Sequence, residues 1–306
     1  MKKNDANSFR FIIGLILLIS FGIPQFVWAQ SPQHLQNLNV SPLQKGEFFL
    51  FSKKPEEALK IFEDLWEQEP QNSYAVRGVV RSYQALKKLP DVVSMLSQYL
   101  EKHSQSSPAS YGLGYAYYLQ GKFEDSRKVL NEALKFDRKN VLALNNLSAT
   151  LAELKDYKGA LQKVREAINI APNKLMLYRN LQMVYASSGQ PEKFEKEYQD
   201  FLAEKVSSKA RGYGLVLAQQ LRQKSFKLYV GGQIDECIRA IVEMLALYRE
   251  VNHEPGIVAG LFSLAVLYEE QGKAELALEK YREVLKINPQ HIQARVKSKS
   301  LGPKKE

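Results

Sequence analysis

The sequence predicts an all-α protein, a solenoid built from stacked helix–turn–helix repeats, and two observations carry this prediction. The same residue classes return every 34 positions along most of the chain. Within each such unit, apolar residues follow i, i+3, i+4, i+7 spacing on two segments of about 12 to 14 residues, which predicts two amphipathic helices. Each hairpin would bury its apolar faces only against its neighbours, so the units are expected to stack.

The N-terminal segment, residues 1–29, is typical of an export signal. Three basic residues precede the apolar run FIIGLILLISFGI at residues 11–23, and Val27 and Ala29 provide the small residues that a signal peptidase requires. Cleavage after Ala29 would leave a periplasmic or secreted protein that begins with a lead-in at residues 30–38. The alternative is an uncleaved inner-membrane anchor with periplasmic repeats, because the apolar stretch approaches the roughly 17 residues of a minimal span.

Columns of equivalent residues run through the repeats that follow. Large residues recur in one column, and small residues recur where two helices are expected to approach closely. The large column reads Phe49, Tyr83, Tyr117, Leu151 and Tyr185, and the small positions include Gly114, Ser126, Ala133, Ala160 and Ala167.

Turns are predicted between the two helices of each unit. They fall at Gly121–Lys122, Lys155–Asp156, Gly189–Gln190 and Gly272–Lys273. Glycine can adopt the left-handed conformation that ends a helix without a Cβ penalty. The second helices are then expected to stop before Pro70, Pro172 and Pro289, since proline has no backbone donor with which to continue a helix.

These spacings resemble the tetratricopeptide repeat, whose pattern is W-x2-L-G-x2-Y…A-x3-F…P. The segment AGLFSLAVLYEEQGKAELALEKYREVLKINP matches through Leu264, Ala265, Tyr268, Ala277, Tyr281 and Pro289. The segment LALNNLSATLAELKDYKGALQKVREAINIAP matches through Leu147, Ser148, Leu151, Ala160, Val164 and Pro172. The resemblance implies a right-handed α-solenoid with a concave inner face, and a function in binding other proteins.

The period sets the expected domain boundaries. One array covers residues 39–208 and a second covers residues 218–291, with a break in the period at 209–217. The individual repeats are 39–72, 73–106, 107–140, 141–174 and a divergent 175–208, then a divergent 218–251 and 258–291. Helix boundaries across 200–230 stay open, and one longer continuous helix is the alternative there.

In the tetratricopeptide family the ligand usually lies against the first helices, so the resemblance implies that positions 2, 5, 6, 9, 12 and 13 of each repeat line the groove. Their side chains can hydrogen-bond an extended backbone, stack, and pair with carboxylates, which suits a protein or peptide partner. The alternative is that they are solvated positions without a ligand. The expected partner-binding residues are Arg77, Arg81, Gln84, Tyr111, Tyr115, Tyr118, Asn145, Asn146, Arg179, Asn180 and Met183.

The charge is uneven along the chain, which has a net charge of +10. About half of the excess that remains after residues 1–29 lies in the tail at residues 292–306, which has little apolar periodicity and is expected to lack regular structure. In the last repeat, the apolar residues Phe262 and Val266 fall on the groove face, and we expect the tail or a second subunit to cover them.

Two further kinds of partner stay open as alternatives. The N-terminal segment or the basic tail could contact an anionic glycan or a membrane surface, and a second copy could fill the groove of a homo-oligomer. Nucleic acid is not expected as a partner, because the charge lies at one end and export separates the chain from cytoplasmic nucleic acid.

Signatures of catalysis and of cofactor or metal binding are absent from the sequence. It contains no H-E-x-x-H, paired-cysteine, G-x-S-x-G or Walker A pattern. The four histidines are more than thirty residues apart, and Cys237, the only cysteine, falls in a column of small residues and is expected to be buried. We therefore expect neither an enzyme nor a bound cofactor.

Overall fold

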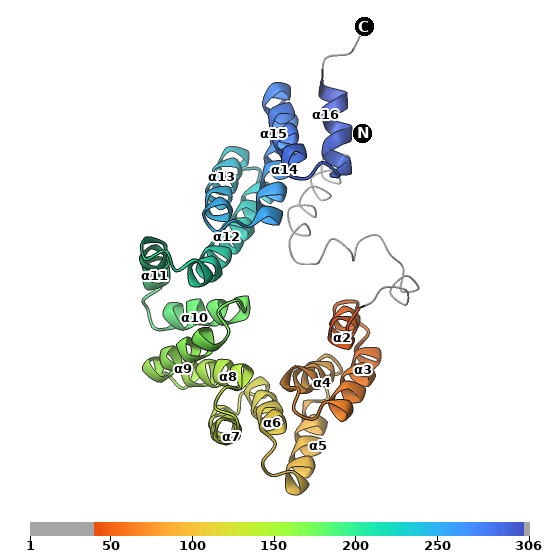
Figure 1. Cartoon of the computed structure of the whole chain (residues 1–306), viewed down its shortest axis with the longest axis vertical. Coiled ribbons are helices and arrows are strands. Elements are labelled where there is room, and N and C mark those ends of the chain that lie inside the picture. The colour runs from red at the N-terminus through yellow and green to blue at the C-terminus, as the bar shows by residue number, and fades with distance from the viewer. Residues whose placement is uncertain (1–39, 303–306) are drawn as a thin grey trace. The chain divides into compact units, whose positions relative to one another are not determined.

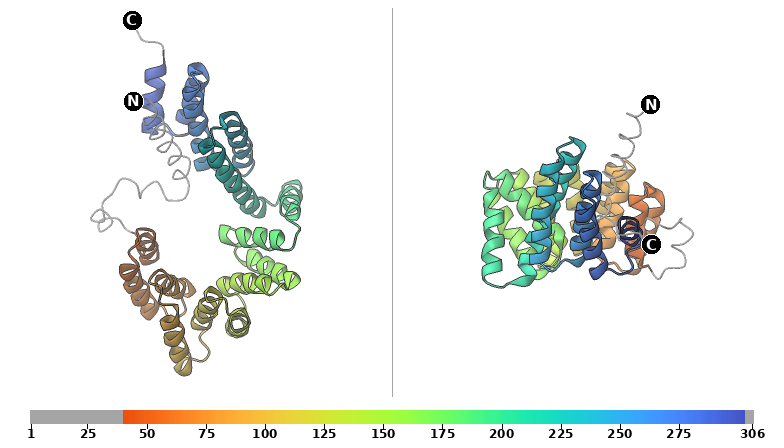
Figure 2. Two further views of the ribbon diagram at one scale, coloured as in Figure 1. Left: turned by 180° about the vertical axis from the view of Figure 1, so that it is seen from behind. Right: turned by 90° about the horizontal axis from the view of Figure 1, so that it is seen from above.

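The computed structural model describes residues 40–302, and all regular structure in that range is helical, as the sequence predicts. The helices form two compact units, one that ends at Glu197 and one that begins at Tyr198. Within each unit successive helices pair as antiparallel hairpins that stack into an α-solenoid (Figures 1 and 2). The segment predicted to direct export, residues 1–29, lies outside the described residues.

The N-terminal unit follows the predicted repeats one hairpin at a time. First helices also pack on first helices, because α2 contacts α4, α4 contacts α6, α6 contacts α8 and α8 contacts α10. The pairs are α2 (Pro42–Phe51) with α3 (Pro55–Gln68), α4 (Ser73–Ala85) with α5 (Leu89–Lys102), α6 (Ser107–Leu119) with α7 (Phe123–Phe136), and α8 (Val141–Glu153) with α9 (Tyr157–Ile170), followed by α10 (Leu175–Ser187). The next helix, α11 (Glu192–Ala203), contains the boundary between the two units.

The turns inside these hairpins share one backbone geometry. The residue with a left-handed backbone recurs every 34 positions, and the predicted positive φ at Gly121 and Gly189 is confirmed. At the first of these turns the amide of Lys122 donates to the carbonyl of Tyr117 at 3.0 Å, which closes the end of α6. Lysine occupies the same place at three turns, so this conformation does not require glycine here. The five residues are Lys53, Lys87, Gly121, Lys155 and Gly189.

Close helix contacts occur at the small positions. The ring of Phe62, a fully buried side chain of α3, lies between Gly46 of α2 and Gly78 of α4. Ser126 and Thr150 share a buried hydrogen bond of 2.9 Å between α7 and α8. The second helices α3 and α9 end two residues before Pro70 and Pro172, as expected.

The C-terminal unit contains two longer hairpins and a final helix. The 24-residue α12 runs straight through residues 209–217, so these residues are not a linker between arrays, and the alternative of one continuous helix is confirmed. Buried Tyr213 and Val216 fix this part of α12 in the core. The helices are α12 (Ser207–Val230) with α13 (Ile234–Glu250), α14 (Glu254–Glu270) with α15 (Ala274–Ile287), and α16 (Ile292–Leu301).

The prediction that the tail lacks regular structure was wrong for residues 292–301, which form α16. The His291 side chain caps this helix by accepting from the amide of Ala294 at 3.2 Å, and its ring packs on Phe262 with centroids 4.8 Å apart. Lys297 pairs with Glu269 of α14 at 2.7 Å, and Ala294 is fully buried. Ala294 belongs to the same buried cluster as Phe262, so the start of the tail packs on this repeat, which was one of the two expected alternatives.

Candidate functional site

The predicted partner-binding residues all lie on α4, α6, α8 and α10, the first helices of four successive hairpins in the N-terminal unit. Because these helices contact one another in order, they form one continuous layer. We call the surface of this layer that faces away from α5, α7 and α9 the first-helix face. Each residue contributes to it according to its position on its helix, and burial divides the predicted set into accessible and inaccessible members.

Arginine and tyrosine meet between α4 and α6. Arg77 and Arg81 are one turn apart on α4, and both are half-buried. Burial raises the pKa of Tyr111 and Tyr115 on α6, and the charge of Arg77 is the largest influence that acts in the opposite direction on each. Because α4 and α6 are in contact, these predicted residues lie on adjoining helices, where the charge of Arg77 acts on both phenols.

The two arginines differ in their partners. Arg81 donates to a carboxylate oxygen of Glu47 on α2 at 2.6 Å, so its charge is neutralised within the unit. Arg77 has no ion pair or hydrogen bond among the residues that the structure describes. A partly desolvated guanidinium without an acceptor is unfavourable. Arg77 is thus a basic group of this face that is open to an external acceptor.

Tyr111 cannot contact a partner directly in this structure, because its side chain is fully buried. It packs in a cluster with Leu142 of α8 and Met176 of α10, and its ring stacks on that of Tyr115 at 6.2 Å between centroids. Its role is to hold the half-buried Tyr115 in place. Tyr118 lies at the far end of α6, with its ring 5.7 Å from that of Phe123.

The predicted asparagines, Asn145, Asn146 and Asn180, are buried, and only some of their side-chain hydrogen-bonding groups have partners. The Asn180 amide nitrogen donates to the backbone carbonyl of Asn145 at 2.9 Å and to its side-chain oxygen at 3.1 Å, which ties α10 to α8. Asn146 is 9% exposed, and its Nδ2 donor has no partner among the described residues. Buried donors are normally paired, so this amide is a candidate for binding a carbonyl or carboxylate oxygen.

Three predicted residues are open to solvent. Arg179 and Gln84 are exposed, and Met183 on α10 is 64% exposed. An exposed methionine side chain is flexible and polarisable, which suits contact with varied apolar groups. The structure shows no contact of Met183 with Arg77 or Tyr115, so the predicted set is spread over the face and does not form one cluster.

Three residues of this region were not predicted. The ammonium of Lys174, which precedes α10, lies 5.1 Å from the ring centroid of Tyr74 on α4. Asn140, which precedes α8, donates to Ser73 and Ser107 at 3.0 Å each and so joins the starts of α4, α6 and α8. Tyr74 is at position 2 of its repeat, so the repeat pattern could have indicated it. Lys174 and Asn140 end their repeats, outside the ligand positions.

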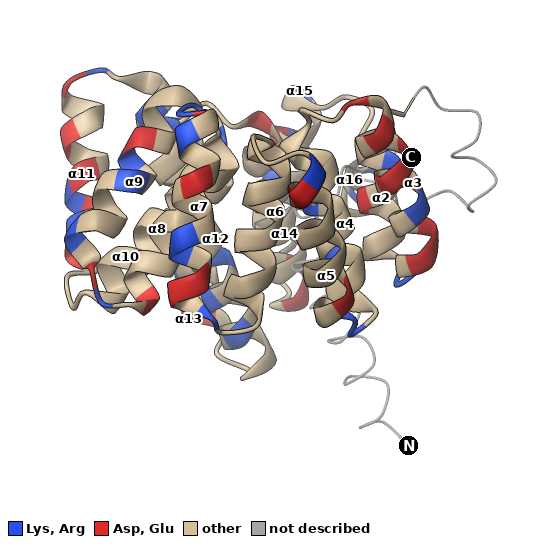
Figure 3. Cartoon of the chain, turned by 90° about the horizontal axis from the view of Figure 1, so that it is seen from below, with Lys and Arg blue, Asp and Glu red and all other residues tan. Residues whose placement is uncertain are grey.

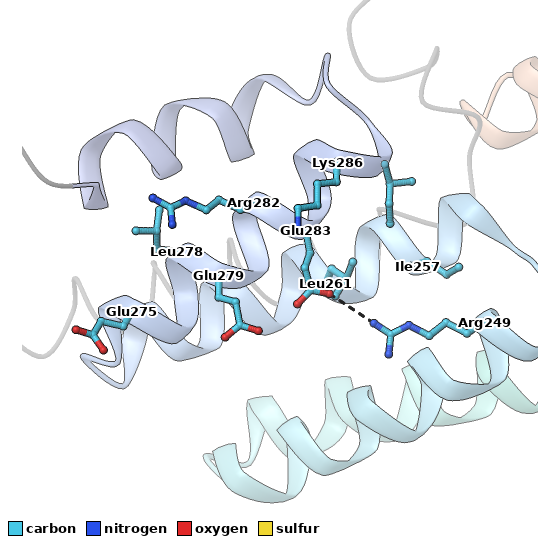
Figure 4. A pocket seen from close by; sticks show the side chains of 10 residues that line it. Arg249, Ile257, Leu261, Glu275, Leu278, Glu279, Arg282, Glu283 and Lys286 are labelled. Atoms are coloured by element: carbon cyan, nitrogen blue, oxygen red, sulfur yellow. Dashed lines mark ion pairs between the residues drawn. The ribbon is translucent and has the colours of Figure 1, made fainter.

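The C-terminal unit has a separate hollow of about 910 Å³, lined by α13, α14 and α15 (Figure 4). Leu261 and Ile257 supply apolar surface, and Arg249 pairs with Glu283 across it at 3.6 Å. The remaining charges of its lining, Glu275 and Glu279 against Arg282 and Lys286, balance each other, so the hollow favours neither anions nor cations. None of the predicted residues lies there.

Other kinds of site were sought within residues 40–302. No group of three or more histidine, cysteine, aspartate or glutamate side chains there could hold a metal ion. No helix in this range is long and apolar enough to cross a membrane. Cys237 is buried, as expected, and burial together with Glu270 raises the pKa of its thiol to about 12.

Comparison with known families gives two matches. Residues 114–154 match a model described as TPR repeat, and residues 258–291 match a model described as tetratricopeptide repeat. The second match coincides with the last repeat expected from the period. A comparison with curated proteins gave no match.

Solved structures of similar architecture include repeat proteins. A tetratricopeptide repeat protein from Parabacteroides merdae has 12% identity, with 85% of this chain and 97% of that chain covered and a TM-score of 0.38. YrrB, described as a TPR protein with an unusual peptide-binding site, has 17% identity, coverage of 78% and 97%, and a TM-score of 0.33. A crystal structure of MamA has 16% identity, coverage of 53% and 88%, and a TM-score of 0.38. At these values the similarity adds nothing about partners.

The family therefore rests on the matched segments and on the hairpins that contain them. Both segments fall on helices that pair as the repeat requires, with α6–α8 in one and α14–α15 in the other. The chain therefore contains tetratricopeptide repeats at residues 114–154 and 258–291.

Proposed function

We propose that this chain is an exported scaffold or adaptor that binds a protein or peptide partner in the cell envelope through the first-helix face. Tetratricopeptide repeat proteins serve as scaffolds for protein–protein interaction, and they are generally not catalytic. The observation that favours this face is the half-buried Arg77 without an internal acceptor, beside the stacked pair Tyr111 and Tyr115. Rigid aromatic side chains with arginine are the residue types that dominate binding energy at protein interfaces.

The proposed site can be tested by affinity capture with paired variants. Arg77→Glu with Met183→Glu changes two residues of the first-helix face outside the fully buried core. Ile170→Glu, on α9, is the control, because Ile170 is 43% exposed and lies on a second helix of the same unit. Partners retained by the control and lost by the double variant support the site. If the same partners persist with the double variant, the site is elsewhere, provided that circular dichroism shows an intact fold.

Export is supported by the basic and apolar sequence of residues 1–29 alone. N-terminal sequencing of the protein from fractionated cells tests it. A mature chain in the envelope fraction that begins at Gln30 is the expected result. A chain that keeps Met1 and remains in the cytoplasm would contradict export, whereas one that keeps Met1 in the membrane fraction would favour the uncleaved anchor.

A second candidate function is contact with an anionic surface through α16. This helix has no acidic residue, and Ile292 and Val296 are 74% and 60% exposed one turn apart. Exposed apolar residues beside lysine and arginine favour the interface of an anionic membrane. Sedimentation with vesicles that contain anionic lipid, compared between wild type and Ile292→Ser with Val296→Ser, would separate this activity from that of the first-helix face.

A further inference from the structure

The first-helix face is selectively depleted of acidic side chains. Helices α4, α6, α8 and α10 carry Arg77, Arg81 and Arg179 but a single acidic residue, Glu153. The second helices α3, α5, α7 and α9 carry eleven acidic residues. Figure 3 shows the contrast, with α8 and α10 almost wholly tan beside the charged α9 and α11. Anionic groups in this unit therefore lie mainly on the opposite side of the hairpins.

Two positive groups of the face lie near aromatic side chains. The Lys174 ammonium lies over the ring of Tyr74, and the charge of Arg77 lowers the pKa of Tyr111 and Tyr115 against the effect of burial. The contact of Lys174 orients a cation but does not neutralise it. Neither Arg77 nor Lys174 has a carboxylate partner within the described part of the chain. The face therefore keeps two cations without counter-charges.

An unsatisfied hydrogen-bond donor accompanies these cations. The Nδ2 atom of Asn146, on α8, is buried and has no acceptor among the described residues. A bound chain would supply acceptors of two kinds, because its carboxylates suit the guanidinium and its backbone carbonyls suit the amide. An extended segment offers a carbonyl at every residue, so both needs can be met by one ligand.

We infer that the segment bound by the first-helix face is acidic, and that a side-chain carboxylate of this segment pairs with Arg77 while a backbone carbonyl accepts from Asn146. This inference rests on the proposed function, which it narrows from any peptide to one rich in aspartate or glutamate. Complementary charge also speeds association and lowers affinity for basic competitors. Arg77 is the specificity-determining residue, and Asn146 recognises the backbone without regard to side chains.

The test uses the full mature chain and three end-blocked peptides of twelve residues, identical except that alternate positions hold glutamate, glutamine or lysine. Binding is measured by fluorescence anisotropy at two salt concentrations. The glutamate peptide should bind most tightly and lose affinity as salt rises. Arg77→Gln should weaken this peptide by about tenfold to a hundredfold, the range expected for a charged hydrogen bond, and should leave the glutamine peptide nearly unchanged.

Two further variants separate the roles. Arg127→Gln on α7, whose arginine is exposed and paired with Glu124, removes the same charge from the opposite side and should change nothing. Asn146→Ala should weaken the glutamate and glutamine peptides by similar factors, because it removes a contact with the backbone. Circular dichroism of each variant must match that of wild type.

Several outcomes would overturn the inference. Equal affinity for the glutamate and glutamine peptides, or no effect of Arg77→Gln, would show a peptide site without acidic specificity and leave the proposed function intact. Vesicles of anionic lipid that bind through Arg77 while no peptide does would replace the peptide by a membrane surface. If no peptide binds at all, the inference is overturned, and the capture experiment with the first-helix variants decides separately whether the proposed function also fails.

Discussion

The substitution Gly78→Ala should destabilise the N-terminal unit, although alanine is the better helix former. A Cβ atom added at Gly78 would lie 2.3 Å from both Cγ and Cδ1 of Phe62, whereas favourable carbon contacts begin near 3.5 Å. The ring cannot retreat, because a Cβ at Gly46 on its other side would lie 2.5 Å from its Cζ atom. The two glycines thus leave α2, α3 and α4 just enough space for one phenyl ring.

The net effect follows from two opposing contributions. Overpacking a well-packed core costs about 1 to 3 kcal/mol, and the short distances with no free space favour the upper end. Replacing glycine by alanine within a helix gains about 1 kcal/mol. We therefore expect Gly78→Ala to lower the free energy of unfolding by about 2 kcal/mol. In a Phe62→Ala background the ring is gone, so Gly78→Ala should instead stabilise by about 1 kcal/mol.

Tryptophan fluorescence during urea unfolding provides a local assay. Trp66 is buried in the same cluster as Phe62, and it is the only tryptophan in a chain that begins at Gln30. Comparison of the four proteins of this double-mutant cycle gives the coupling between Gly78 and Phe62. The change of sign is the decisive result. If Gly78→Ala destabilises equally in both backgrounds, the contact with Phe62 is not the cause and the packing argument is refuted.

Three further predictions concern a joint between helices, two caps and a thiol. Asn140→Ala should cost about 2 to 3 kcal/mol, because it removes the cap of α8 and two hydrogen bonds to Ser73 and Ser107. Asn72→Ala removes the cap of α4 and an exposed hydrogen bond to Glu69 but no hydrogen bond to another first helix, so it should cost about 1 kcal/mol in the same urea assay. Equal losses would contradict the joint. His253 and His291 accept hydrogen bonds from backbone amides at the starts of α14 and α16, and burial lowers the pKa of each below 6.5. The stabilisation by these two caps should therefore be present above pH 6.5 and fall as the pH drops below it. His253→Asn with His291→Asn should flatten this pH dependence of the melting temperature, and an unchanged profile would count against the two caps. The Cys237 thiol, whose pKa burial raises to about 12, should resist a disulfide reagent at pH 8 until the protein is unfolded, and rapid labelling of the native chain would show that it is accessible.

Most of the fold could be predicted from the sequence because repeats express the same physical requirement many times. The column of Tyr83 and Tyr117 marks the carbonyls that accept the last hydrogen bond of each first helix, from Lys88 and Lys122. Periodicity also located the turns at residues 121, 155 and 189, including the one in which Lys155 replaces glycine. A single such turn would have been a weak signal, but three at one spacing were not.

The C-terminal unit was harder to predict because α12, α13 and α14 are longer than any helix of the N-terminal unit. The interruption of the period at residues 209–217 results from a longer helix, which stays buried through Tyr213 and Val216. The prediction that the tail lacks regular structure was wrong for a different reason. Helix α16 is held in place by one buried alanine, a histidine cap and an ion pair with Glu269. These contacts are made with other parts of the chain and leave little apolar period in the tail itself.

The candidate site was predictable by position but not by accessibility. The repeat pattern placed Arg77 and Tyr115 on successive first helices, and these helices, α4 and α6, are in contact. It could not show that Tyr111 is fully buried, or that Asn180 hydrogen-bonds to Asn145, because both depend on how closely α6, α8 and α10 approach. The charge of Arg81 was likewise predictable, but its pairing with Glu47 was not.

The central claim is that a partner lies on the first-helix face, and site-specific photocrosslinking in cells tests it most directly. A photoreactive amino acid at Met183, which is 64% exposed on α10, is compared with the same amino acid at Ile170, which is 43% exposed on α9. The account predicts a discrete crosslinked protein from position 183 that is absent from position 170 and is lost when Arg77→Glu is added. Crosslinks of equal yield from both positions, or from position 170 alone, would contradict it.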